Sequence, residues 1–137
     1  MVSKKFPGKF NCLGDICEFV TGEAKAAGLD EKEIYAVQLA VDEACTNIIE
    51  HAYGGEGKGD IELICKVVND GMEIVLKDDG EPFDPDLITK PKIGLPLEEV
   101  EPRGAGIFLI RKLMDEVIYE FSSGIGTVLK MKKKKRG

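Results

Sequence analysis

The stretch DEACTNIIEHAY, residues 42–53, decides how the middle of the chain folds. Apolar residues in and before it recur every three or four positions, which predicts one buried seam of a long α-helix. These residues are Ile34, Val37, Val41, Ala44 and Ile48. Glu43, Asn47 and His51 follow one another at intervals of four, so the helix stacks them on a neighbouring face. The helix therefore carries a second, polar face that burial of the seam does not explain.

The bulk composition favours one globular domain, residues 1–137, because 43% apolar residues in a chain of this length can bury a continuous core. Six of the 19 basic side chains lie in residues 130–137, which leaves 13 against 25 acidic side chains in residues 1–129. An acidic body disfavours a nucleic-acid groove, since phosphate binding needs a cationic surface. The basic end is predicted to be a flexible, solvated tail.

The four cysteines predict a reducing, cytoplasmic location. Cys12, Cys17, Cys45 and Cys65 form no C-x-x-C pair, and two of them fall inside apolar patterns typical of reduced core residues. The chain has no run of 18 apolar residues, and no apolar segment of a signal peptide follows its first residues. Neither membrane spanning nor secretion is expected.

The residues before the opening stretch predict one helix and the start of the long helix that contains the stretch itself. A short extended piece is expected first, followed by a helix at about 13–28 whose C-terminus is marked by Gly28. Asp30 with Glu33 predicts a capping box at the start of the long helix, which runs to about Ala52. The glycine-rich residues 54–59 then end it.

The C-terminal half predicts an antiparallel sheet. Its expected elements are strands at 60–68 and 72–78 joined around Asp70 and Gly71, a loop at 80–104, a helix from about 105, and a last hairpin of strands at 117–123 and 126–134 that turns around 124–126. The loop contains five prolines and no sustained period, so we expect a functional loop or lid. The whole order predicts an α+β fold: a two-layer sandwich with a mainly antiparallel sheet and helices on one face.

Asp78 ends a predicted strand in which Met72, Ile74 and Leu76 face the core, so its carboxylate points the same way. An inward carboxylate needs hydrogen-bond donors. Backbone N–H groups of the following turn are the more common partners, and a ligand amine such as the exocyclic amino group of adenine is the functional alternative. Gly80 would let the backbone pass close to a flat base.

Gly104-Ala-Gly106 precedes a predicted helix whose free N–H groups suit a phosphate, although ordinary loop closure explains such a pattern more often. Arg103 either adds charge to that phosphate or is simply a surface arginine. On the polar helix face, Asn47 offers an oxygen to Mg²⁺, and Glu43 offers a carboxylate that serves as a base or contacts a metal-bound water. Zinc fits poorly, because the chain has a single histidine. A solvated polar face is the alternative.

Four motifs together resemble a known superfamily. DEACTNIIEHAY is similar to the N-box, DDGEPFDP (residues 78–85) to the first glycine box, RGAGIFLI (residues 103–110) to the second, and GTVLKM (residues 126–131) to the Gly-Thr box. These boxes belong to the ATPase superfamily of gyrase, heat-shock chaperones, histidine kinases and mismatch-repair proteins. The combination most resembles the bacterial anti-sigma-factor serine kinases, over about residues 10–131. Pro82, where many members of the superfamily have glycine, fits this subfamily.

The resemblance implies a Bergerat ATP-binding fold with Mg-ATP under a lid at residues 82–103. From their positions in the motifs, it implies that Asn47 holds magnesium, that Glu43 is the base for a serine hydroxyl, and that Asp78 recognises the adenine base. It further assigns Gly80, Gly104 and Gly106 to the pocket and Thr127 to the adenine end, and Arg103 joins the nucleotide-binding candidates as the predicted phosphate contact.

The implied function is a protein serine kinase that phosphorylates an anti-sigma-factor antagonist and, in another state, holds a sigma factor as a homodimer. Two alternatives remain: an ATP-switched binding module without phosphoryl transfer, and a stand-alone domain with some other partner. Retention of both Glu43 and Asn47 favours the kinase, since a pure switch has no need of the base.

Overall fold

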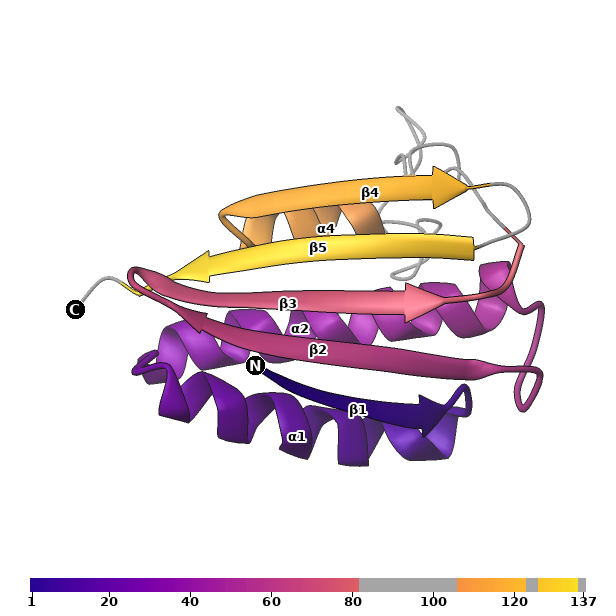
Figure 1. Ribbon diagram of the computed structural model, residues 1–137, viewed down its shortest axis with the longest axis horizontal. Helices are drawn as coiled ribbons and strands as arrows, with labels where there is room; N and C mark the ends of the chain where they lie inside the picture. The colour runs from indigo at the N-terminus through magenta and orange to yellow at the C-terminus, as the bar shows by residue number, and fades with distance from the viewer. Residues whose placement is uncertain (82–105, 123–125, 136–137) are drawn as a thin grey trace, which may run out of the picture.

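The computed structural model describes residues 1–81, 106–122 and 126–135 as an α+β sandwich. Its five antiparallel strands lie in the order β1-β2-β3-β5-β4, and the described helices cover one face of the sheet (Figure 1). The strands are β1 (Val2–Pro7), β2 (Asp60–Val68), β3 (Gly71–Asp78), β4 (Glu116–Ser122) and β5 (Gly126–Lys134). The helices are η1 (Phe10–Cys12), α1 (Leu13–Ala26), α2 (Glu31–Asn47), η2 (Ile48–Ala52) and α4 (Gly106–Leu113). The predicted fold class is confirmed.

Helix α2 begins at the predicted capping box. The Glu33 N–H donates to Asp30 Oδ1 at 2.8 Å, and the Asp30 N–H donates to Glu33 Oε1 at 2.8 Å. The apolar seam is buried along α2, with Val37 and Val41 at most 1% exposed. The helix continues to Ala52 as predicted, but its last turn, η2, is a π-helix. Such wide turns often occur at functional sites.

The N-terminal segment, expected only as a short extended piece, is the edge strand β1. It pairs antiparallel with β2 from Val2 opposite Cys65 to Pro7 opposite Asp60. The predicted helix that follows is confirmed as α1, and Gly28 adopts a φ of 83° just after its end.

The turn between β2 and β3 consists of Asn69 and Asp70, so the prediction of Asp70 and Gly71 is wrong by one residue. Gly71 instead opens β3 and pairs with Val68. A side chain at Gly71 would overlap the backbone carbonyl of Lys133 in β5. Close approach of the neighbouring strand, rather than the turn, therefore requires glycine here.

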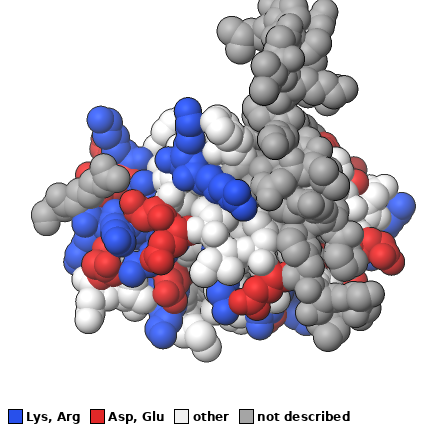
Figure 2. Space-filling model, turned by 90° about the horizontal axis from the view of Figure 1, so that it is seen from above, with Lys and Arg blue, Asp and Glu red and all other residues white. Residues whose placement is uncertain are grey.

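The strand predicted at 126–134 is confirmed as β5. The prediction of a flexible basic tail at 130–137 is therefore wrong for residues 130–134, which form the second half of this strand. The run of charges conceals an alternation in which Met131 and Lys133 face the helices and are buried. Opposite charges accompany two of the outward lysines: Lys130 Nζ lies 3.5 Å from Glu120 Oε1, and Lys132 Nζ lies 3.0 Å from Asp70 Oδ1. Figure 2, seen from the β4 edge of the sheet, shows basic and acidic side chains lying side by side toward one end of the molecule.

Lys133 joins β5 to the C-terminal end of α4. Its Nζ donates to the backbone carbonyl of Leu113 at 2.6 Å and lies 4.0 Å from Asp115 Oδ2. A cation at a helix C-terminus satisfies a carbonyl that the helix itself leaves unpaired. Lys133 is therefore a structural part of the fold.

We expect Lys133→Ala to lower the free energy of unfolding by about 1.5–3 kcal/mol, because it removes a charged donor from the part-buried Leu113 carbonyl. Lys134→Ala, at the exposed neighbouring position, serves as the control and should stay within about 0.5 kcal/mol of wild type. Urea denaturation measures both. Equal stability of the two variants would contradict this role of Lys133.

The predicted lid, residues 82–103, lies outside the described residues, as does most of the predicted loop at 80–104. The helix expected from about 105 is confirmed as α4, where Ile110 is fully buried. None of the helices that the structure describes is long and apolar enough to cross a lipid bilayer.

Candidate functional site

Asn47 is the last residue of α2, and it is 1% exposed. Its Oδ1 and Nδ2 are both buried and have no hydrogen-bond partner among the described residues. A buried amide without partners costs about 1–3 kcal/mol, so such groups generally have a bound partner in the functional state. The alternative of a solvated polar face therefore does not hold for Asn47.

Glu43 lies one helical turn before Asn47 on the same face of α2. It is half-buried, and its Oε2 is buried. His51 follows one turn later in η2 and is also half-buried. The helix thus places a carboxylate and an amide oxygen together, a pair that can accept a proton and contact a hard cation.

Asp78 faces the helix layer at the end of β3, as the strand alternation predicts, and it is 7% exposed. The Gly80 N–H donates to its Oδ1 at 3.0 Å, so the backbone partner expected from the following turn is present. Burial raises the pKa of Asp78 to about 6; the Asp79 charge adds to the rise, and the Gly80 hydrogen bond opposes it. The carboxylate is therefore buried at a cost that a ligand donor would offset.

Thr127 lies directly opposite Asp78 in the pairing of β5 with β3. It is 3% exposed, and its Oγ1 is buried without a hydrogen-bond partner among the described residues. The preceding Gly126 has a φ of 109°, and a side chain there would overlap the Asp78 backbone carbonyl. The structure thus brings two polar side chains predicted for one end of the site onto adjacent strands.

Gly80 lies against the end of η2. A Cβ atom at Gly80 would be 2.5 Å from the Ala52 backbone oxygen, and the Glu81 N–H donates to that oxygen at 2.8 Å. The close approach that requires glycine is thus to Ala52. The helix that carries Asn47 is thereby tied to the turn that follows Asp78.

Tyr53, which was not among the predicted site residues, makes a second connection between the helix and this turn. Its hydroxyl is hydrogen-bonded to Asp79 Oδ1 at 2.7 Å, next to Asp78 in the chain. Burial and the Asp79 hydrogen bond raise the pKa of Tyr53 above its ordinary value. The only sequence signal was its place at the end of the quoted N-box-like stretch.

Comparison with known proteins identifies the family of the chain. Residues 6–133 match the histidine kinase-like ATPase domain. The chain belongs to this ATPase family. Of the residues predicted for the nucleotide site, the structure describes Glu43 and Asn47 on α2 and Asp78 and Thr127 at the strand ends, and their roles stay predictions.

The similar proteins of this ATPase family include serine-protein kinases named RsbW. The chain is 37% identical to RsbW of Halalkalibacterium halodurans over 131 residues, covering 93% of this chain and 78% of that protein. It is 33% identical to RsbW of Bacillus cereus strain B4264, covering 96% and 83%. The resemblance to serine kinases read from the four motifs is confirmed.

Solved structures show the same fold. The RsbU and RsbW domains of Rv1364c from Mycobacterium tuberculosis align with a TM-score of 0.67 at 17% identity, covering 98% of this chain and 32% of that one. The catalytic domain of histidine kinase ThkA aligns with a TM-score of 0.55 at 15% identity, covering 98% of both chains. At these identities the likeness concerns the fold.

The predicted phosphate end of this ATPase domain is described only in part. Arg103 and Gly104 lie outside the described residues, and Gly106 is the first residue of α4. Helix α4 packs against α2, so its N-terminal end belongs to the same helix layer as Asn47. The roles of Arg103, Gly104 and Gly106 stay predictions.

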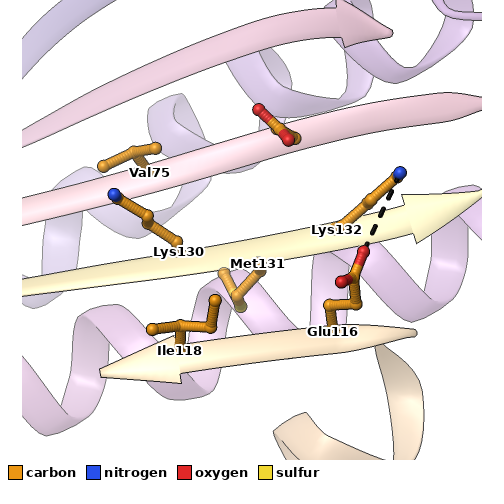
Figure 3. A pocket seen from close by; sticks show the side chains of 7 residues that line it. Val75, Glu116, Ile118, Lys130, Met131 and Lys132 are labelled. Atoms are coloured by element: carbon orange, nitrogen blue, oxygen red, sulfur yellow. Dashed lines mark ion pairs between the residues drawn. The ribbon is translucent and has the colours of Figure 1, made fainter. Parts of the chain in front are cut away.

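A hollow of about 240 Å³ lies on the opposite, outer face of the sheet (Figure 3). Val75, Ile118 and Lys130 are among its lining residues, and Lys132 Nζ lies 3.8 Å from Glu116 Oε2 beside it. None of the predicted site residues lines this hollow. It is separate from the predicted nucleotide site.

Proposed function

We propose that the chain is an Mg-ATP-dependent protein serine kinase that acts as an anti-sigma regulatory factor. The observation that carries the proposal is Asn47, a buried amide without a described partner, one turn after Glu43 in a chain of the histidine kinase-like ATPase family. The RsbW relatives are named serine-protein kinases. The proposal takes residues 1–137 as a single ATPase domain, consistent with its one continuous sheet.

The residues present fit a magnesium nucleotide. Asn47 Oδ1 would hold Mg²⁺, which prefers a few protein oxygens together with phosphates and water. When bound, the ion neutralises the negative charge of the phosphates. Asp78 would accept a hydrogen bond from the adenine amino group, with Thr127 beside it. Gly80 shapes the adenine end, and Arg103, Gly104 and Gly106 would face the phosphates.

Phosphoryl transfer requires the substrate serine Oγ to form a bond to the γ-phosphorus while the bond to the leaving ADP oxygen breaks. The serine proton must go to a base, and Glu43 is the carboxylate on the Asn47 helix face that can accept it. The rest of the catalysis would come from holding nucleotide and serine in line.

The proposed partners are a sigma factor and an anti-sigma-factor antagonist, and the proposed assembly is a homodimer. We further propose a cytoplasmic location, which the four free cysteines support. No nucleic-acid or membrane partner is proposed.

The test is capture of partners from the native cell, followed by incubation of the captured proteins with γ-labelled ATP. We expect label on a serine of one captured protein. ATP-dependent partner binding without labelling of any antagonist from the same cell would contradict the kinase and support the ATP-switched binding module.

A further inference from the structure

The hydroxyl of Tyr53 connects three segments that are distant in the sequence. Tyr53 follows η2 directly, and its ring carries the hydroxyl to β2 and to the end of β3. The hydroxyl lies 2.7 Å from Asp79 Oδ1 and accepts the Asp79 N–H at 3.2 Å. It also lies within hydrogen-bond distance of the Asp60 backbone carbonyl. The single hydroxyl proton is donated either to Asp60 or to Asp79.

The Tyr53 ring is held in place by glycine backbone. A side chain at Gly59 would overlap the ring, and one at Gly8 would lie 3.4 Å from it. The Gly8 N–H also donates to the Gly59 backbone carbonyl at 2.8 Å, which fixes these two residues against each other. The ring therefore has a defined position, and its hydroxyl is a fixed point for Asp79.

The neighbouring residue Ala52 makes the second connection to the same turn. Its carbonyl accepts the Glu81 N–H at 2.8 Å, and Gly80 lies against it. Residues 78–81 are thus held at Asp79 by Tyr53 and at Glu81 by Ala52. Between these two points, the Gly80 N–H donates to Asp78 Oδ1 at 3.0 Å and sets the direction of the carboxylate.

We propose that Tyr53 is a positioning residue for adenine recognition: it holds Asp79 and thereby orients the Asp78 carboxylate toward the base. The inference rests on the proposed function, in which Asp78 accepts the adenine amino hydrogen. It adds a residue that contacts no nucleotide and acts through the turn. Because Tyr53 and Asn47 belong to one helical segment, the same segment positions both ends of the nucleotide site.

The test compares Tyr53→Phe, which keeps the ring and removes the hydroxyl, with Tyr35→Phe, which removes a hydroxyl from a tyrosine that is 61% exposed. We expect Tyr53→Phe to weaken ATP binding roughly 2- to 10-fold, the range of one ordinary hydrogen bond. GTP affinity, measured by the same calorimetry, should be unchanged, so the ATP-to-GTP affinity ratio falls. Tyr35→Phe should leave both affinities unchanged. A general loss of structure would lower both affinities together.

A double-mutant cycle tests the route through Asp78. In an Asp78→Asn background, Tyr53→Phe should have no further effect on ATP affinity, because the group that it positions is already changed. Additive effects of the two substitutions would overturn the inference.

Amide hydrogen exchange of the nucleotide-free protein separates the inference from the proposed function. Tyr53→Phe should speed exchange at the Asp79, Gly80 and Glu81 amides, and Tyr35→Phe should not. If wild type binds ATP and Asp78→Asn weakens it, but Tyr53→Phe leaves exchange and ATP affinity unchanged, the inference is overturned and the proposed function stands. A wild-type chain that binds no adenine nucleotide refutes both.

Discussion

Glu43→Gln is expected to slow transfer of the γ-phosphoryl group to a protein serine by roughly 10²–10⁴-fold, the usual scale for loss of a general base. Glutamine has nearly the same shape as glutamate but is neutral, and its amide cannot take up the serine proton. ATP affinity and partner binding should therefore remain at the wild-type level. The measurement is single-turnover transfer of labelled phosphate to the antagonist, with nucleotide affinity determined alongside.

Asn47→Ala is the matched comparison on the same helix face. Because Asn47 is proposed to hold magnesium, this variant should weaken magnesium-dependent nucleotide binding as well as transfer. Glu43→Gln should therefore change only the rate of transfer, whereas Asn47→Ala should change both the nucleotide affinity and the rate of transfer. Wild-type transfer by Glu43→Gln would remove Glu43 from the chemistry and leave the remaining assignments in place.

The long helix could be predicted from the sequence because its determinants are local. The capping box joins Asp30 and Glu33, three residues apart, and the buried seam repeats every three or four residues. The edge strand β1 could not, because it pairs with β2 nearly sixty residues later, from Val2 opposite Cys65 onward. Its own pattern is weak, since only Phe6 among its six residues is buried.

The basic end of the chain shows how composition can conceal a period. Four of the five residues 130–134 are lysines, and charge alone indicated a solvated tail. The alternation still places Lys133 on the buried side, where the carbonyl end of α4 accepts its hydrogen bond. Nothing near Lys133 in the sequence predicts that partner, because Leu113 reaches it only in the folded chain.

The site shows the same division between local and tertiary signals. Strand alternation places Asp78 on the buried side, and the motif resemblance brings Asn47 and Thr127 into the prediction. The Tyr53–Asp79 hydrogen bond spans 26 residues and depends on how η2 meets the end of β3. In the proposed function, the stretch that decides the fold would therefore contribute a magnesium ligand at Asn47 and a support for the adenine end six residues later at Tyr53.

Asp78→Asn is expected to weaken ATP binding about 10- to 150-fold at pH 8, because a hydrogen bond to a charged acceptor contributes about 1.5–3 kcal/mol. The effect should depend on pH. The pKa of Asp78 in the free protein is about 6, and the protonated carboxyl is a poorer acceptor for the adenine amino group. Wild-type affinity should thus fall as pH decreases through 6, by at most tenfold per pH unit, whereas the variant's affinity stays level. Calorimetry between about pH 5 and pH 8 measures both.

The stability of the nucleotide-free protein should change in the opposite direction. The folded-state pKa of Asp78 is raised above the unfolded value of about 4, so the folded chain binds the proton more tightly. Wild type should therefore gain stability relative to Asp78→Asn as pH falls from about 8 to about 4. Denaturation of both proteins across this range measures the difference. General unfolding at low pH would reduce both the stability and the ATP affinity of wild type. An ATP affinity that falls while the stability relative to Asp78→Asn rises would therefore identify Asp78 as the group responsible for both effects.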